Sequence, residues 1–489
     1  MNRFAIYILL CVPALFAIEG HDPTPRFIPP DFSVEEDRIT TPGDLIDFFS
    51  QPFVEYLRMT TNSRKINPFL DASSESEALG GIDFQYVNFF GRFRGRQFYF
   101  GDDNPRQMLR WVDFRAGYAD ILLDKIPVGV ITEADYGYFR GVYEPSQYTF
   151  KAIGEAHIPL ANFLASPYAQ TERNSWNQRP GLLIRNQPYD PHRQIITNAY
   201  GGGLILKATI SEYTGFRAEA SAKRSTRYRE GVWERQNQII SALGTMVFDS
   251  EPLRIEVGGE GHKTWEETII APHLDFHLTG QSFYIRAILG SEANLPTRTA
   301  WKLSPRVDYP TNARNIITPT LVDILGRLEL KPDQFLMGHL DYRTIRGRPV
   351  LLSPLDEAPQ VQCLDISHQA FTIRLLNDFG TFSNSLSLTL KSDEHKGIQI
   401  PTEPLQIVAD TFVVELGSGF SIQASGVRQH LPQIAPKVIN DIGIGARYNY
   451  DKYQFLLGIS NILRNDIWDE NALMLSREIR FWGGISVDL

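Results

Sequence analysis

The sequence predicts a mainly β protein: a transmembrane antiparallel β-barrel of about 18 strands, possibly up to 22, preceded by a small N-terminal α+β domain. From about residue 134 onward, polar and apolar residues alternate with the period of two typical of strands whose faces meet different environments. Tight turns, such as those at 417–419 and 451–452, alternate with long polar connections, such as 224–236, as do the periplasmic turns and outer loops of a barrel. Aromatic residues, 12% of the chain, suit the aromatic girdles of such a barrel.

The N-terminus has the pattern of a secretory signal. Arg3 precedes an apolar run over residues 4–16, which is too short to cross a bilayer as a helix. No later stretch reaches 18 consecutive apolar residues, so the sequence predicts no membrane-spanning helix. We therefore expect a signal peptide over residues 1–17 and an N-terminal periplasmic segment over residues 18–37.

Residues 38–133 do not follow the rhythm of the barrel. The stretch 40–59 has apolar residues at mostly helical spacing, and short strands interrupted by Gly and Pro follow it. We therefore expect a small α+β domain over residues 38–133 and the barrel over residues 134–489.

The last twelve residues, EIRFWGGISVDL at 478–489, predict the strand that closes the barrel. Apolar residues share one parity there: Ile479, Phe481, Ile485, Val487 and Leu489. A single-chain barrel with an even number of strands has both chain ends in the periplasm. Because the odd positions of this strand are the apolar ones, they are expected to face lipid.

Composition and motifs argue against several classes of protein. The chain has 48 Lys and Arg against 57 Asp and Glu, so no nucleic-acid partner is indicated. Once the signal is removed only Cys363 remains, which excludes an internal disulfide and favours a buried or bystander thiol over a reactive one. The stretch GGEGHKT (258–264) has His262 where a phosphate-binding loop requires Gly.

No pattern predicts a catalytic, metal or cofactor site, so we expect a protein that is not an enzyme and has no cofactor. His273 and His277 are four apart, but on a predicted strand rather than a helix, which favours a lumen or girdle position over zinc binding. The polar parity of the strands forms either a solvated lumen wall or a ligand-contacting interior; it comprises Arg217, Lys223, Arg254, Glu256, Arg327, Glu329, Arg374 and Arg447.

Tryptophans in the predicted outer loops leave two interpretations open. They either bind a ligand or anchor the barrel at the membrane interface. These residues are Trp176, Trp233, Trp265 and Trp301.

Several stretches resemble the TonB-dependent receptor family. DRITTPGDLIDFF (37–49) and NFFGRFRGRQFYFGDD (88–103) resemble parts of the family's plug domain, and DIGIGARYNYDKYQFLLGISNIL (441–463) resembles its penultimate hairpin. WVDFRAGYADILLDKIPVGVI (111–131) resembles the late plug motif, carried by Asp113, Arg115, Gly117, Pro127 and Gly129. The resemblance implies that residues 38–133 form a plug inside the barrel lumen.

The resemblance also implies a function. A protein of this kind lies in the outer membrane of a Gram-negative bacterium, with membrane lipid, a small or bulky solute and the inner-membrane TonB complex as partners. It binds a scarce solute at the cell surface and passes it to the periplasm by TonB-energised plug movement. DFSVEED (31–37) is the candidate TonB box. The alternatives are a passive porin-like channel and a surface binding or adhesion barrel, and no motif identifies the solute.

Overall fold

The computed structural model describes most of the chain from residue 64 onward. The described ranges are 64–73, 78–86, 89–100, 107–122, 126–140, 143–161, 163–180, 193–297, 312–331, 334–351, 361–400, 405–430, 438–464, 467–468, 474–476 and 479–487. The predicted signal peptide, the segment 18–37 with its candidate TonB box, the predicted helix and Trp301 lie outside these residues. Within the described ranges, no helix has the length and apolar character needed to span a membrane.

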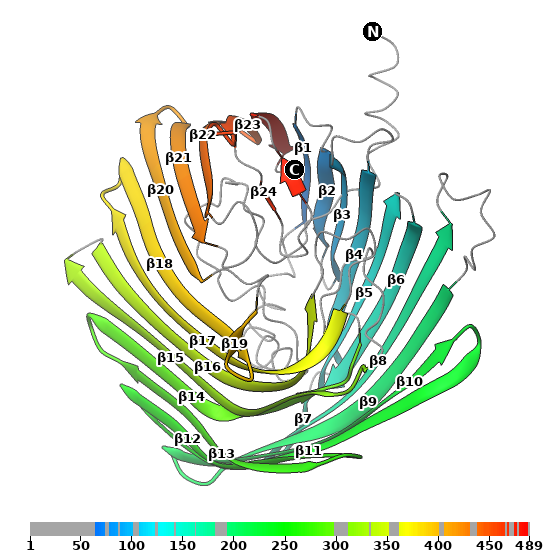
Figure 1. The fold of residues 1–489 in the computed structure, drawn as a ribbon. Helices are drawn as coiled ribbons and strands as arrows, with labels where there is room; N and C mark the ends of the chain where they lie inside the picture. The colour runs from blue at the N-terminus through cyan, green and yellow to red at the C-terminus, as the bar shows by residue number, and fades with distance from the viewer. Residues whose placement is uncertain are drawn as a thin grey trace.

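One antiparallel sheet winds round on itself and closes (Figure 1). Its strands are β1 (Arg64–Ser73), β2 (Ala78–Tyr86), β3 (Phe89–Phe100), β4 (Gln107–Leu122), β5 (Ile126–Arg140), β6 (Tyr143–Ala156), β7 (Ile158–Leu160), β8 (Phe163–Pro180), β9 (Arg193–Thr209), β10 (Thr214–Arg229), β11 (Val232–Ser250), β12 (Leu253–Thr264), β13 (Thr268–Thr279), β14 (Phe283–Asn294), β15 (Ile316–Lys331), β16 (Gln334–Leu351), β17 (Val361–Asp378), β18 (Phe382–His395), β19 (Ile398–Gln399), β20 (Gln406–Gly417), β21 (Phe420–His430), β22 (Val438–Tyr450), β23 (Tyr453–Ser460) and β26 (Arg480–Val487). Two short strands, β24 (Ile467–Trp468) and β25 (Met474–Ser476), form a separate pair.

The wall of the barrel contains 22 strands among the described residues. The sheet as a whole has 24 strands, but β7 continues β6 along the same edge of β8, and the two residues of β19 pair only with β18. The ring closes where β1 pairs with β26. The prediction of a barrel is therefore confirmed, with the strand number at the upper value rather than at 18. The four strands missing from the lower number are β1 to β4, which precede residue 134.

The predicted plug is wrong for residues 64–133. These residues form β1 to β4 and the first half of β5, each hydrogen-bonded on both edges to neighbouring wall strands. Their apolar residues, such as Phe114, Tyr118 and Val130, are exposed on the wall. Gly91 allows the ring of Phe84 on β2 to pack closely against the backbone of β3. A Cβ at this position would lie 2.2 Å from that ring, so a larger residue would clash. The expected boundary at residue 134 falls inside β5.

The wall has two different faces, as the alternation predicted. On β18, Leu386 and Leu390 are 44% and 47% exposed, whereas Asp393, on the opposite parity, has no exposed surface. On β13, Ile270 is exposed while His273 and His277 pair with carboxylates on the polar face. An apolar outer face and a polar lumen are the pattern of a barrel that crosses a membrane.

Tight turns cluster at the end of the barrel where the chain finishes. The predicted hairpins at Gly417–Gly419 and at Asp451 are confirmed, with positive φ angles of 86° at Gly417, 54° at Ser418 and 52° at Asp451. A long loop expected over residues 224–236 is wrong. There β10 and β11 continue to a turn at Glu230 and Gly231, because the charged residues at their ends pair across the two strands.

Candidate functional site

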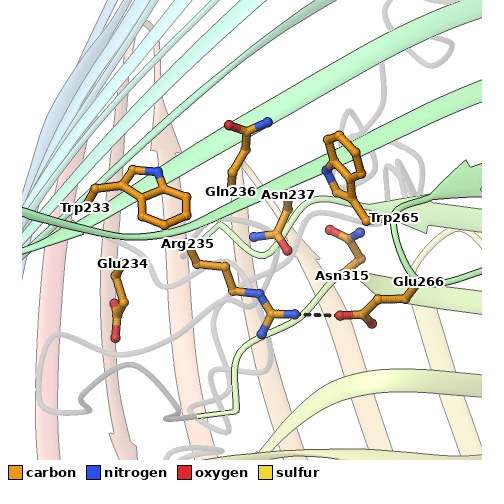
Figure 2. Close-up of a pocket in the computed structure, with 8 residues that line it drawn as sticks. All are labelled: Trp233, Glu234, Arg235, Gln236, Asn237, Trp265, Glu266 and Asn315. Carbon is orange, nitrogen blue, oxygen red and sulfur yellow. Dashed lines mark hydrogen bonds and ion pairs between the residues drawn. The ribbon is translucent and has the colours of Figure 1, made fainter.

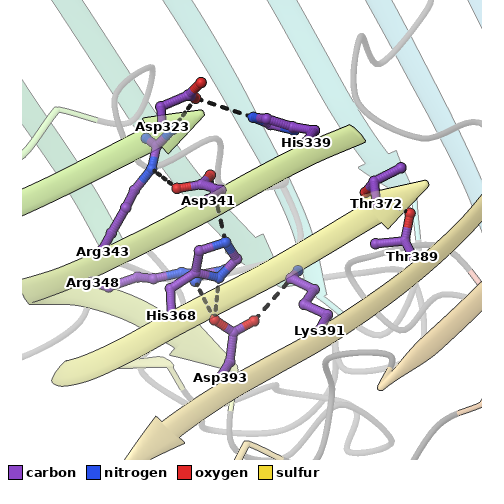
Figure 3. A network of polar contacts seen from close by, with 10 residues as sticks. All are labelled: Asp323, His339, Asp341, Arg343, Arg348, His368, Thr372, Thr389, Lys391 and Asp393. Carbon is purple, nitrogen blue, oxygen red and sulfur yellow. Dashed lines mark hydrogen bonds and ion pairs between the residues drawn. The ribbon is translucent and has the colours of Figure 1, made fainter. Parts of the chain in front are cut away.

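A chain of ion pairs crosses four neighbouring strands on the lumen side of the wall (Figure 3). It begins at Asp323 on β15, whose Oδ2 lies 3.3 Å from Nε2 of His339 and 3.9 Å from Nη2 of Arg343, both on β16. Arg343 Nε donates to Asp341 Oδ1 at 2.7 Å, and Asp341 in turn lies 3.7 Å from His368 on β17. All these residues have the lumen-facing parity of their strands, so the network lines the interior.

The network ends at a fully buried carboxylate, Asp393 on β18. Its Oδ1 lies 2.6 Å from Nδ1 of His368 and 3.3 Å from Nη1 of Arg348, and its Oδ2 lies 3.4 Å from Nζ of Lys391. A buried carboxylate is costly unless charged partners compensate it. Asp393 is compensated from three strands at once, which ties β16, β17 and β18 together.

The charges of this network balance. Three carboxylates (Asp323, Asp341, Asp393) face three permanent cations (Arg343, Arg348, Lys391), and the two histidines add charge only when protonated. No group of three or more His, Cys, Asp or Glu in the described residues is arranged to hold a metal ion. The network therefore gives the lumen a polar surface without fixing a metal there.

A second polar network lies on β10 to β13. Arg217 Nη1 lies 3.6 Å from Glu256, whose Oε1 also accepts a 2.7 Å hydrogen bond from Thr245. Glu256 is 2% exposed at its side chain, and Glu219 lies 3.5 Å from the same guanidinium. The sequence placed Arg217 and Glu256 on the lumen parity, and the structure confirms it. The partners of Glu219 and Glu256 in this network are themselves residues of the barrel wall.

The residues of the late plug motif lie in the barrel wall instead. Asp113, Arg115 and Gly117 are on β4, and Pro127 and Gly129 are on β5, the strand paired with it. Arg115 Nε lies 3.3 Å from Oε1 of Glu133, its cross-strand partner. The motif is therefore one wall hairpin, and Arg115 contributes to the polar lumen face.

An apolar cluster joins distant parts of the barrel at its outer end. Trp176 on β8 and Ile195 on β9 pack with Ala313 and Cys363, the latter on β17. Trp176 is 1% exposed, so it is a core residue that neither contacts a ligand nor anchors the barrel at the membrane interface. Cys363 is buried as predicted, and it lies beyond the membrane-spanning part of β17. Burial there raises the pKa of its thiol to about 11, which keeps it protonated.

The segment before β15 is fixed to β17 by side-chain hydrogen bonds. Asn312 donates from Nδ2 to the carbonyl of Cys363 and accepts the Cys363 N–H at Oδ1, both at 2.9 Å. Arg314 forms an ion pair with Asp365 at 2.5 Å. These contacts hold Asn315 at the rim of the barrel.

An open pocket of about 300 Å³ lies at this rim (Figure 2). Two tryptophans line it: Trp233 beside the β10–β11 turn and Trp265 between β12 and β13. They are 58% and 66% exposed. The remaining lining residues are Glu234, Arg235, Gln236, Asn237, Glu266 and Asn315.

Ion pairs fix the polar lining of this pocket. Arg235 donates from Nη1 to the carbonyl of Ala313 and from Nη2 to Glu266, both at 2.6 Å. Glu234 pairs with Arg227 at 2.8 Å and with Arg229 at 3.3 Å. Asn237 and Asn315 are 6% and 7% exposed. The pocket therefore combines two exposed indoles with a polar surface of paired charges and buried amides.

The sequence pointed to Trp233 and Trp265 but missed their polar neighbours. Arg235 and Asn237 share a parity on β11, so the parity rule could have grouped these two, whereas the register shift just after Trp233 separates it from them. Asn315 could not have been found in this way, because its place depends on hydrogen bonds made by the preceding residues to another strand.

Comparison with known proteins gives similarity in structure only. No protein-family model and no curated protein matches the sequence. The copper transporter OprC matches with a TM-score of 0.67 at 11% identity, over 87% of this chain and 81% of its own. The FrpB iron transporter of Neisseria meningitidis, in its apoprotein form, matches with a TM-score of 0.66 at 8% identity, over 89% and 82%.

The siderophore receptor PirA from Acinetobacter baumannii matches with a TM-score of 0.64 at 9% identity, over 88% of this chain and 81% of its own. These structures are TonB-dependent receptors, and the chain is similar in fold to transporters and receptors rather than to enzymes. At such low identity the similarity concerns the fold. The chain has the closed-barrel fold of the TonB-dependent receptors.

Proposed function

We propose that this protein is an outer-membrane receptor and transporter of a Gram-negative bacterium, which binds a scarce solute at the cell surface and delivers it to the periplasm. The observation that carries the proposal is the closed wall of 22 strands with an apolar outer face and a charged lumen. Such a wall suits lipid outside and a polar solute inside. The rim pocket supplies a place for initial capture.

The proposal includes energisation by the inner-membrane TonB complex. Its support is the shared fold with proteins titled as copper and iron transporters and as a siderophore receptor. The charge-balanced network on β15 to β18 agrees with this role, because a surface without a large excess of one charge does not bind a passing ion strongly.

The test is solute uptake by a strain that lacks the protein, with the gene restored, and by the same strain with TonB inactivated. We expect restored uptake and outer-membrane fractionation of the protein, and loss of uptake without TonB. A large steady conductance in planar bilayers together with TonB-independent uptake would support the porin-like alternative. Surface attachment without uptake of any solute would support the adhesion alternative.

A further inference from the structure

We propose that the rim pocket binds a neutral saccharide, with the faces of sugar rings against Trp233 and Trp265 and a hydroxyl group donating to Asn315. This inference rests on the proposed function, because it names the class of solute captured at the outer face. Three features of the pocket carry it: the position of the indoles, the pairing of its charged side chains and one buried acceptor.

The first feature is the position of Trp233. It is the second residue of the 19-residue strand β11 and lies at the end remote from the tight turn with β12. A membrane-spanning strand needs only about 9–11 residues, so Trp233 lies beyond the bilayer. The register with β10 shifts at Glu234, so Trp233 stands apart from the regular alternation that exposes Ile240 and Met246 on the wall. Trp233 therefore does not anchor the barrel in the membrane interface.

The two indoles lie apart in the pocket, with Asn237 between them and Asn315 beside Trp265 (Figure 2). The face of an indole carries partial negative charge. The axial C–H groups of a sugar ring carry partial positive charge and form a flat apolar face, so they fit against it. A cavity of about 300 Å³ is at the small end of ligand pockets and suits one or two sugar rings.

The second feature is that the charged side chains lining the pocket are paired, which favours a neutral ligand. Arg235 is paired with Glu266, and Glu234 is paired with Arg227 and Arg229. An anionic ligand would have to compete with Glu266 for the guanidinium. A quaternary ammonium ion could stack on an indole, but Glu266, the carboxylate beside Trp265, is already paired with Arg235. A polyhydroxylated neutral ligand needs no ion pair to break.

The third feature is the side chain of Asn315. It is 7% exposed and lines the pocket, yet its Oδ1 accepts no hydrogen bond from any described residue. A buried acceptor without a donor is unfavourable, and a ligand that donates a hydrogen bond removes that cost. A sugar hydroxyl is such a donor. The side chain lies beside Trp265 (Figure 2), within the same pocket as the indole on which the sugar ring would stack.

The test is equilibrium binding to the purified full-length barrel in detergent, measured by tryptophan fluorescence and by calorimetry. The probes are maltose, cellobiose, lactose and N,N′-diacetylchitobiose, with glucuronate and choline as charged competitors. We expect at least one neutral disaccharide to bind and both charged probes to fail. Trp233→Ala and Trp265→Ala should each weaken binding about tenfold or more, since about 1.4 kcal/mol of lost stacking corresponds to that factor.

Matched variants separate the site from the fold. Val232→Ala alters an exposed neighbour of Trp233 outside the pocket and should leave binding unchanged. Asn315→Leu removes the acceptor and should weaken binding, whereas Asn315→Asp keeps an acceptor of the same shape and should retain it. Each variant is compared at equal amounts of heat-modifiable barrel.

Binding of glucuronate or choline alone, failure of all four disaccharides, or disaccharide binding unaffected by both tryptophan substitutions would overturn the inference. These outcomes are distinct from failure of the proposed function. Disaccharide binding without cellular uptake would remove the transport role and leave the site. Uptake of another solute without disaccharide binding would remove the site and leave the transport role.

Discussion

Adjacent residues on one wall strand meet opposite environments, and β17 shows this clearly. Ile373 is 39% exposed on the outer face, between its cross-strand partners Gly338 and Leu388. Thr372 lies on the lumen face, where its hydroxyl is hydrogen-bonded to that of Thr389 at 2.9 Å (Figure 3). The difference between the two positions follows from the pleat of the strand.

Ile373→Arg should therefore cost about 2–4 kcal/mol of unfolding free energy, the value for an arginine facing lipid near the bilayer midplane. The residue lies five positions before the end of β17 at Asp378, about half of a membrane-spanning stretch. Thr372→Arg should cost only about 1 kcal/mol, because it loses one hydrogen bond but faces the lumen. Urea unfolding of the vesicle-reconstituted barrel measures both. Equal losses would show that the two faces are assigned incorrectly.

At the scale of elements, the decisive feature is the seam at which the barrel closes. Five residues of β1 pair with β26, from Phe69 opposite Ser486 to Ser73 opposite Trp482. The C-terminal strand therefore closes the ring, as its alternation predicted, but its partner is a strand that was assigned to a plug. A plug strand would leave these two edges apart.

Leu70 and Ile485 are opposite each other in this seam, so replacing both by Cys in a Cys363→Ser background should produce a disulfide. Facing residues of antiparallel strands have Cα atoms about 4.5–5.5 Å apart, within the range that a disulfide spans. Gel mobility with and without reductant measures the cross-link. The matched control joins Leu70→Cys with Ile444→Cys on β22, which is separated from β1 by β26 and β23 and should not cross-link. Cross-linking only in the control would exclude the seam.

At the scale of the whole molecule, stability depends on an uninterrupted ring. A transmembrane barrel leaves no strand edge unpaired in lipid, because an unpaired backbone group there costs several kcal/mol. The pairing of β1 with both β2 and β26 completes the ring, and the cluster around Ala313 joins its outer ends across β8, β9 and β17.

Deletion of residues 64–133 should therefore abolish the heat-modifiable, membrane-inserted form, because it removes β1 to β4 and half of β5. Deletion of residues 38–63, which lie outside the described residues, leaves all the described strands of the wall in place and should preserve that form. Electrophoresis of heated and unheated outer-membrane fractions compares the two. A heat-modifiable barrel after the first deletion would mean that residues 64–133 are not part of the essential wall.

The sequence by itself determined the features that depend on neighbours along the chain. The two faces of each strand, the turns at Gly417–Gly419 and Asp451 and the lumen position of Arg217 and Glu256 all follow from a period of two and from turn chemistry. The cysteine count favoured a buried or bystander thiol at Cys363, and the thiol is buried.

Only the tertiary structure decided what depends on partners distant in sequence. A strand's alternation does not state which edge it pairs with, so β1 to β4 match both a plug and a wall, and the pairing of β1 with β26 decides for the wall. The late plug motif likewise became a wall hairpin around Arg115 and Glu133. The rim pocket was decided in the same way, because Asn312 holds Asn315 near Trp233 and Trp265 by bonding to a strand about 50 residues away. Parity is a local property, whereas ring closure and a shared pocket are set by long-range hydrogen bonds.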